Sequence, residues 1–270
     1  MKFAYLSVIF AFAFAACQKP ASLSVVAPTV PKPEAAQRIP LKTLAVGLPA
    51  PTWDATKKAN LESETSTSIE DTYTKIKTSK KVIAITFDDG PHPQNTPRLL
   101  DMLKDRGVKA TFFVVGNMVR YNPQLLRRMV AEGHEIGNHT VTHGTLSRMN
   151  DSGLRKELTE AHQQILAATG VPPRCMRPPG GAIKADQKQL MLREFGYPTI
   201  LWSCDPKDWQ RPGVDVVTQR LIDGAYPGGI LLVHDLHKPT VDAMPRTLDH
   251  LLGQGYTFVT ISELIAMDES

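Results

Sequence analysis

From residue 81 onward, short apolar runs alternate with segments whose apolar residues recur every three to four positions. The run Lys81–Phe87 (KVIAITF) is rich in β-branched residues and ends at a turn signal, Asp88-Asp89-Gly90-Pro91, which is typical of a buried strand. Segments such as Thr96–Arg106 space their leucines on one helical face and stop at a glycine, which predicts helices. The predicted strands are 81–87, 110–115, 199–203, 229–234 and 256–260; the predicted helices are 96–106, 123–132, 152–169, 185–195, 214–223 and 240–252, before a terminal helix.

This alternation predicts an α/β fold with a parallel sheet and right-handed crossovers. The pattern leaves an open doubly wound sheet and a closed barrel as alternatives. In both, the chemistry lies where the carboxyl ends of the strands meet the following loops. Polar residues cluster after several apolar runs, and we expect them to converge on one rim: Asp88-Asp89, Arg177, Asp205–Trp209 and His234-Asp235.

The pattern before residue 80 is different. Residues 1–16 carry Lys2 and then an apolar run that ends in small residues before Cys17, which predicts a signal peptide. The cysteine directly after the small residues resembles a lipoprotein signal, in which Cys17 is acylated; a plain secretory signal with an incidental cysteine is the alternative. Acylation by two chains would tether the protein stably to a membrane.

Residues 17–79 are rich in proline, alanine, serine and threonine and lack sustained periodicity. Such a segment buries too little apolar surface to order itself, so we expect a disordered linker there. The third segment, residues 80–270, is the expected catalytic domain. Together these predictions describe an exported protein of the cell envelope, anchored to a membrane and facing the periplasm or the cell surface.

Composition narrows the function classes. The 270-residue chain is 42% hydrophobic and 21% charged, as in ordinary globular proteins. Its formal net charge of +4 is mild and gives no reason to expect a nucleic-acid partner. Three cysteines are too few for a disulfide scaffold. Cys175 and Cys204 follow neighbouring predicted strands, and we expect free buried thiols, with a disulfide as the alternative.

His139 and His143 lie four residues apart, which on a helical turn would place both imidazoles on one face. No Glu follows His139, so this is not a zincin HExxH helix. Asp88-Asp89, after the first strand, supplies two carboxylates, although acids are also common in turns. Two histidines and one carboxylate leave coordination positions open, as in catalytic metal sites.

These residues carry a resemblance to the polysaccharide deacetylases, the NodB-homology family or carbohydrate esterase family 4. Its five motifs occur in family order across residues 81–267: Thr86-Phe87-Asp88-Asp89-Gly90-Pro91, His139-Thr140-Val141-Thr142-His143, Arg177-Pro178-Pro179-Gly180-Gly181, Asp205-Pro206-Lys207-Asp208-Trp209 and Leu232-Val233-His234-Asp235. The resemblance implies a distorted (β/α) barrel, and a divalent metal, usually zinc, held by the second aspartate of the first motif and by both histidines. These are Asp89, His139 and His143; cobalt and nickel suit the same ligands.

The resemblance also implies the catalytic roles. Asp88 is the general base and Arg177 its charged partner. His234 is the acid that protonates the leaving amine, and Asp208 orients it and keeps it protonated. The backbone N–H of Gly180 donates to the oxyanion.

Trp209 and Leu232 would form the walls of the pocket for the acetyl methyl group, although Trp209 alone could equally be a core aromatic. The family usually has an aromatic residue where this chain has Gly180, followed by Gly181, so we expect a cleft that is more open there or is closed by another loop. Among the other histidines, we expect His92 and His134 to hold loops, whereas contact of His237 with substrate is the less favoured alternative. We expect His162 and His250 at the surface.

The resemblance implies hydrolysis of the N-acetyl group of N-acetylglucosamine in an envelope polysaccharide, with peptidoglycan first. Chitin oligomers, a β-1,6-linked N-acetylglucosamine polymer and O-acetyl xylan are alternative substrates. A non-catalytic glycan-binding lipoprotein and a hydrolase of non-sugar amides are the competing classes.

Overall fold

The main predicted strands pair in parallel in the computed structural model, which describes residues 72–270. The central strands have the order β4-β3-β2-β6, and a further strand, β7, pairs with the start of β2. Their bounds are β2 (Val82–Asp88), β3 (Thr111–Val114), β4 (Glu135–Asn138), β6 (Ile230–His234) and β7 (Thr257–Phe258). In this register Asp88 lies opposite Phe113 on one side and His234 on the other, so the two polar residues end adjacent strands at the same rim.

The strand pairings that lead from β4 round to β6 are very short. Strand β5 (Thr199–Ile200) pairs with β1 (Thr72–Tyr73). Single bridges then join Asn138 to Met176, Met176 to Thr199, and Cys204 to Leu231. The strands therefore close on themselves through the segments around Met176 and Cys204. The α/β prediction is confirmed, and the structure favours a closed, distorted barrel over an open sheet.

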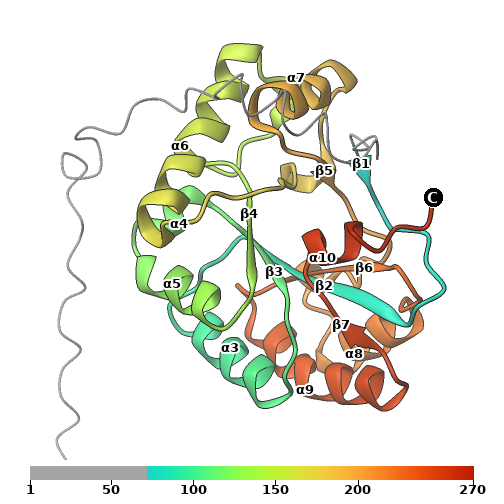
Figure 1. The fold of residues 1–270 in the computed structure, drawn as a ribbon. Helices are drawn as coiled ribbons and strands as arrows, with labels where there is room; N and C mark the ends of the chain where they lie inside the picture. Colours follow the sequence, from blue (N-terminus) through green and yellow to red (C-terminus); the bar gives the residue numbers. More distant parts are fainter. Residues whose placement is uncertain (1–71) are drawn as a thin grey trace, which may run out of the picture. The chain divides into compact units, whose positions relative to one another are not determined.

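Helices surround the strands (Figure 1), with α3, α5 and α6 along one flank and α8 and α9 along another. The sequence pattern predicted α7 (Ala185–Phe195) and α8 (Val214–Asp223) with the observed bounds. The remaining helices are α3 (Asn95–Asp105), α4 (Gly116–Val119), α5 (Pro123–Ala131), α6 (Asp151–Thr169), α9 (Lys238–Gly253) and α10 (Ile261–Ile265), with 3-10 turns η1 (Leu146–Arg148), η2 (Pro179–Gly181) and η3 (Asp208–Gln210). The sequence pattern did not predict β1, β4 or α4, because each is short and lacks an apolar period.

Apolar helix faces pack on the barrel. Leu99, Leu100 and Leu103 of α3 are fully buried in the main core, together with Ile83 and Ile85 of β2. Burying a side chain of this size contributes about 1.5–3 kcal/mol relative to leaving it exposed. This packing holds the ends of β2 and β6 in fixed positions, and the polar site is built on those ends.

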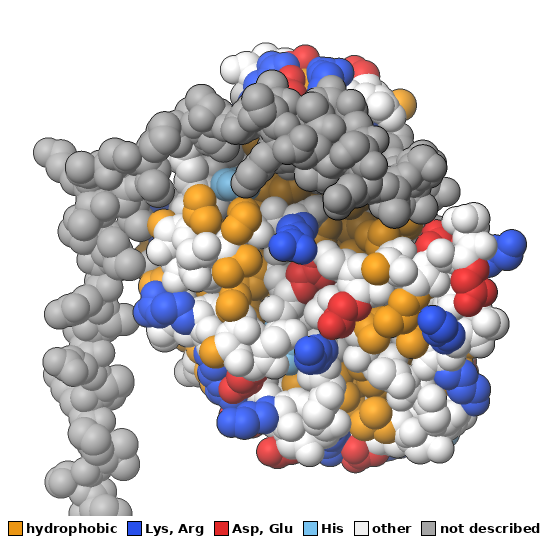
Figure 2. Space-filling model, viewed as in Figure 1, with side chains coloured by type: hydrophobic (Ala, Val, Ile, Leu, Met, Phe, Trp, Pro, Cys, Tyr) orange, Lys and Arg blue, Asp and Glu red, His pale blue; other side chains and the backbone are white. Residues whose placement is uncertain are grey.

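The surface of the described part carries both signs of charge. Acidic and basic side chains are interspersed over the face drawn in Figure 2. Between residues 72 and 270, no helix combines the length and the apolar character needed to span a bilayer. The predicted signal peptide, Cys17 and residues 17–71 of the predicted linker lie outside the described residues. The last residues of the predicted linker are not disordered, because β1 pairs with β5 and Tyr73 and Ile76 are buried in the domain.

Candidate active site and metal centre

Two consecutive aspartates end the central strand. Asp88 is the last residue of β2 and is buried, whereas Asp89 has a φ of 74° and leaves the extended conformation. Successive side chains of a strand point to opposite faces, and this change of φ breaks that alternation. Both carboxylates consequently face the same imidazole: His139 Nε2 lies 3.8 Å from Asp88 Oδ2 and 3.3 Å from Asp89 Oδ1.

The predicted helix around His139 and His143 is wrong. These residues follow β4 in a loop in which Thr140 and His143 have φ values of 67° and 61°. Polar side chains close the turns: Asn138 Oδ1 accepts the Thr140 N–H at 2.8 Å, and Thr140 Oγ1 accepts the His143 N–H at 3.0 Å. The histidines still meet, because this loop folds back on itself.

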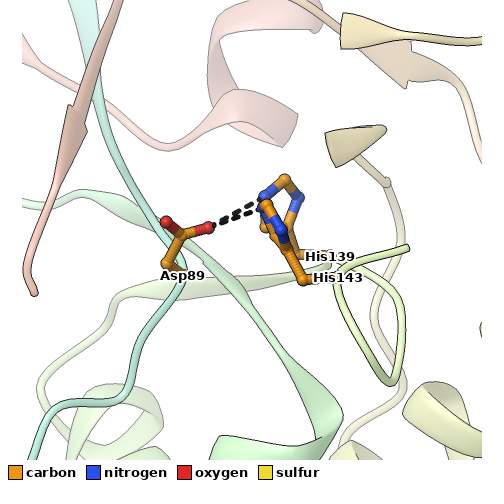
Figure 3. Close-up of side chains that lie close together, drawn as sticks. All are labelled: Asp89, His139 and His143. Carbon is orange, nitrogen blue, oxygen red and sulfur yellow. Dashed lines mark ion pairs between the residues drawn. The ribbon is translucent and has the colours of Figure 1, made fainter. Parts of the chain in front are cut away.

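Asp89, His139 and His143 form a candidate metal centre (Figure 3). Asp89 Oδ1 lies 3.0 Å from His143 Nε2 and 3.3 Å from His139 Nε2, and the three ligand atoms lie within 4.8 Å of one another. His139 Nδ1 is 2.7 Å from the Arg177 carbonyl oxygen, which accepts its proton and leaves the Nε2 lone pair facing the site.

The electrostatics of these three residues favour a cation. Burial alone would raise the pKa of Asp89, but His139 and His143 outweigh it and hold that pKa well below its usual value. Asp89 Oδ1 is buried and accepts no well-directed hydrogen bond. An ionised oxygen without such a partner, beside two imidazole nitrogens, fits the donor set of a divalent transition metal.

Arg177 is completely buried beside Asp88. Its Nη1 donates to Asp88 Oδ1 and to Thr86 Oγ1, both at 2.7 Å. Its other nitrogens donate to the carbonyl oxygens of Ile200 and Leu201, at 3.1 and 3.0 Å. Burial lowers the pKa of Arg177 against the opposing effect of Asp88, yet a guanidinium stays charged in proteins. Arg177 thus fixes the Asp88 carboxylate with Oδ2 directed toward His139.

His234 and Asp208 form a second ion pair across the rim. His234 Nδ1 lies 2.8 Å from Asp208 Oδ1, and Asp208 Oδ2 accepts the His234 N–H at 2.9 Å and the Thr240 hydroxyl at 2.8 Å. Burial would lower the pKa of His234, but Asp208 outweighs it and raises that pKa to about 9. His234 is therefore a protonated imidazole at neutral pH.

The remaining predicted site residues occupy different environments. Gly180 is exposed in η2 with a φ of 59°, and a Cβ at this position would point into open space. Trp209 is 53% exposed in η3, so it is not a core aromatic, whereas Leu232 is buried in β6. Their expected role as walls of an acetyl pocket stays a prediction.

Most expectations for the other histidines are confirmed. His92 Nδ1 accepts the N–H groups of Gln94 and Asn95, and His134 Nδ1 accepts the Ala110 N–H. His250 is exposed, but the surface prediction for His162 is wrong. That residue is half-buried, with Nδ1 2.5 Å from the Tyr197 hydroxyl.

The expectation for the two later cysteines is confirmed as well. Cys175 and Cys204 are free buried thiols, so the disulfide alternative is wrong.

Two acids without a role predicted from the sequence support the site. Glu157 of α6 accepts the N–H groups of Val141 and Thr142 at 3.0 and 2.9 Å and the Thr142 hydroxyl at 2.7 Å. It therefore holds the loop that carries both histidine ligands. An acid within the apolar stripe of α6 was the available signal, because the buried stripe of that helix is Leu154, Glu157, Leu158, Ala161 and Ile165.

Asp235 is the second of these acids and is fully buried. It accepts a hydrogen bond from the Thr96 hydroxyl, which in turn accepts the His92 N–H. A Cβ on Gly90 would lie 2.5 Å from the Asp235 carboxylate, so only glycine allows the turn after Asp89 to pack this closely.

Comparison with known proteins identifies the family. The family described as polysaccharide deacetylase matches residues 75–200. A peptidoglycan-N-acetylglucosamine deacetylase of Bacillus cereus is 42% identical over 192 residues, which cover 69% of this chain and 89% of that protein. The chain belongs to the polysaccharide deacetylase family.

Other members extend the comparison. The peptidoglycan-N-acetylglucosamine deacetylase PgdA of Listeria monocytogenes is 43% identical over 190 residues, which cover 70% of this chain but only 40% of the Listeria protein. A chitooligosaccharide deacetylase of Sinorhizobium fredii is 40% identical over 188 residues, 64% of this chain and 87% of that one.

Solved structures of family members share the fold. The Bc1960 peptidoglycan N-acetylglucosamine deacetylase superposes with a TM-score of 0.69 at 31% identity, covering 74% of this chain and 94% of its own. BA3943 of Bacillus anthracis, described as a pseudoenzyme of the family, reaches the same TM-score and identity, covering 74% of this chain and 70% of its own. Similarity of fold therefore does not decide whether a member is active; its site residues do.

Proposed function

We propose that this protein is a metal-dependent deacetylase that hydrolyses the N-acetyl group of N-acetylglucosamine units in peptidoglycan and releases acetate. One observation carries the proposal. A buried carboxylate fixed by Arg177 and a protonated His234 held by Asp208 both lie at the rim that bears the Asp89-His139-His143 cluster. A base, an acid and a candidate metal centre are thus all present, as amide hydrolysis requires.

The residues divide the reaction between them. A divalent cation, when bound, supplies Lewis acidity that polarises the acetamide carbonyl and makes water easier to deprotonate. Asp88 accepts the proton of the attacking water, and Arg177 keeps its carboxylate oriented. The Gly180 N–H donates to the oxygen on which negative charge develops. His234 then donates its proton to the departing nitrogen, so that the C–N bond breaks and a free amine and acetate leave.

The relatives support peptidoglycan as the substrate, and the ligand set supports zinc as the metal. The Bacillus cereus and Listeria relatives are named for N-acetylglucosamine units of peptidoglycan, and the Sinorhizobium relative for chitooligosaccharides, which makes the latter the alternative substrate. Two imidazoles and one carboxylate with open positions are typical of catalytic zinc.

We also propose that residues 1–16 export the protein and that an acylated Cys17, followed by a linker that ends before β1 at Thr72, anchors the folded domain to a membrane of the cell envelope. Lys2, the apolar run and the small residues before Cys17 support this placement. Replacing Cys17→Ser should release the exported protein from the membrane fraction. Unchanged membrane association would overturn the anchor and leave the catalytic proposal intact.

The decisive experiment measures acetate release by the full chain from peptidoglycan and from chitin oligomers, after metal removal and again after zinc is restored. We expect zinc-dependent release from peptidoglycan that Asp88→Asn abolishes. Asp101→Asn is a matched control, because Asp101 is an exposed acid on α3. Release from chitin oligomers alone would keep the chemistry and change the substrate. No release from any glycan, with zinc bound, would instead indicate a glycan-binding protein without activity.

A further inference from the structure

Five non-glycine residues of the described chain have a positive φ: Asp89, Thr140, His143, Lys207 and Arg211. Such backbones are unfavourable for residues with a Cβ, and they persist where function or surrounding contacts impose them. Asp89 and His143 are candidate metal ligands, and Thr140 binds the His143 N–H. These contacts account for three of the five residues. The side chains of Lys207 and Arg211 make no comparable contact among the described residues.

Lys207 and Arg211 bracket the turn that carries Asp208 and Trp209. We call residues 207–211 the acid-side loop, because Asp208 in it binds the predicted acid His234. Hydrogen bonds of the backbone fix the loop: Asp205 Oδ1 accepts the Lys207 N–H at 2.7 Å, and the Lys207 carbonyl accepts the Gln210 N–H at 3.1 Å. Its conformation is therefore set without any help from the Lys207 or Arg211 side chains.

Both cations are exposed and available. Within residues 72–270, neither side chain takes part in an ion pair or hydrogen bond. The two acids nearby are already occupied, Asp205 by the Lys207 N–H and Asp208 by His234 and Thr240. The loop thus presents two cations that form no ion pair with the described part of the chain, although glycine would adopt either backbone without strain.

These charges lie beside the reaction centre. Asp208 contacts His234 directly, and the Arg211 N–H donates to the Asp208 carbonyl at 2.8 Å. Burial lowers the pKa of His237; Asp208 opposes this effect, whereas the positive charges of Arg211 and His234 add to it. Trp209, 53% exposed between the two cations, offers a flat apolar surface for a sugar ring.

We propose that the acid-side loop selects glycans that carry carboxylates next to the acetylated sugar: Lys207 and Arg211 bind the carboxylates while Trp209 packs on the sugar. Arg and Lys form charge-assisted hydrogen bonds with carboxylates. Peptidoglycan strands bear carboxylates on their peptide substituents, whereas chitin oligomers are neutral. The inference rests on the proposed deacetylase function and names the substrate feature that this site recognises.

The test compares three soluble glycans with the full chain: peptidoglycan strands with free carboxylates, the same strands with their carboxylates amidated, and a chitin oligomer. In the double variant Lys207→Gln/Arg211→Gln, we expect kcat/KM and affinity for the free-carboxylate strands to fall about tenfold, which corresponds to about 1.4 kcal/mol. Both values for the other two glycans should stay within about twofold. The wild-type preference should also weaken as salt is raised.

Two further variants separate charge from shape. Lys104→Gln/Lys156→Gln removes the same charge from exposed positions on α3 and α6 and should behave like the wild type. Lys207→Gly/Arg211→Gly relieves the backbone and should lose the same discrimination. An equal fall on all three glycans, or no fall on any, overturns the inference. Because affinity is measured beside turnover, a protein that binds the carboxylate strands selectively without deacetylating them would contradict the proposed function and leave this inference standing.

Discussion

Three aspartates at the same rim have different protonation behaviour, because their neighbours differ. Burial would raise the pKa of Asp89 and Asp208, but the histidines beside each acid outweigh it and lower the pKa. Asp235 is fully buried without a cation in contact, and burial raises its pKa to about 7 despite the hydrogen bond from Thr96. Contact with a charged partner, not residue type, decides the charge of each carboxyl.

Asp208→Asn should move the alkaline limb of the pH profile. His234 acts as an acid only while protonated, and its pKa of about 9 keeps it protonated below that pH. Without the Asp208 charge, burial lowers the pKa of His234 against the weaker raising effects of Asp88 and Asp89, so the alkaline limb should move to lower pH. A bound cation lowers both values, so the readout is the difference between the kcat/KM profiles of the two proteins. Coincident alkaline limbs would contradict the assignment of His234 as the acid.

Arg177→Met should destabilise the protein strongly, because it leaves the Asp88 carboxylate buried without its cation. Removing one partner of a buried pair costs about 3–5 kcal/mol. Arg155→Gln is the matched control: Arg155 pairs with Glu194 at 2.8 Å at the surface, and its loss should leave stability almost unchanged. Urea unfolding of the three proteins measures the difference. Equal midpoints for both variants would show that Asp88 does not depend on Arg177.

At the scale of elements, the four-residue spacing of His139 and His143 indicated a helical turn, which is wrong, but it also indicated that the two imidazoles lie together, which is correct. Residues four apart lie together on a helix, but a loop whose turns are closed by Asn138 and Thr140 brings the same two imidazoles together. The spacing shows only that the two side chains can lie side by side. The conformation depends on contacts with α6, which no local pattern contains.

Glu157→Gln should weaken metal binding without touching a ligand. The amide replaces one oxygen that accepts N–H groups of the histidine loop, so the loop loses part of its support. Losing such a supporting contact typically weakens metal affinity by about 10–100-fold. Zinc affinity is measured by competition with a chelator, with Glu160→Gln as the control on the same helix, where Glu160 is partly exposed. Zinc affinity equal to that of the wild type would limit Glu157 to a role in stability.

The sequence predicted long elements better than short ones. Helices α7 and α8 span at least ten residues, and their apolar period and terminal glycines define both ends. Strand β4 (Glu135–Asn138) has only Ile136 as a large apolar residue, so no run marks it. Its strand conformation is imposed by pairing with β3, with Glu135 opposite Thr111.

For the whole molecule, the pattern left barrel and open sheet as alternatives because closure depends on single bridges between distant segments. The resemblance of the five motifs predicted the barrel and the pairs Asp88–Arg177 and His234–Asp208, each found in contact. The motifs do not contain Glu157, and they contain Asp235 without indicating its role, because both acids act through other residues.

Metal binding should stabilise the whole domain, because the three candidate ligands come from two separate loops. Free zinc at about 1,000 times its Kd adds about 4 kcal/mol if only the folded state binds it. For a domain of this size, that corresponds to a rise in Tm of roughly 10 °C. Calorimetry with zinc and with a chelator measures the shift, which should vanish in His143→Gln and shrink as falling pH protonates the histidines. A shift that persists in His143→Gln would place the metal elsewhere.

Closure of the barrel through isolated bridges also affects how such a molecule can diversify. Met176 and Cys204 each join the ring through isolated bridges, and directly after them come Arg177 with the Gly180-Gly181 turn, and the acid-side loop. A change of length in either loop disturbs few sheet hydrogen bonds, whereas the long β2–β6 ladder keeps Asp88 beside His234. Evolution can therefore exchange the parts that contact the glycan while the reacting groups keep their positions, so that new specificities arise by loop replacement on an unaltered chemical core.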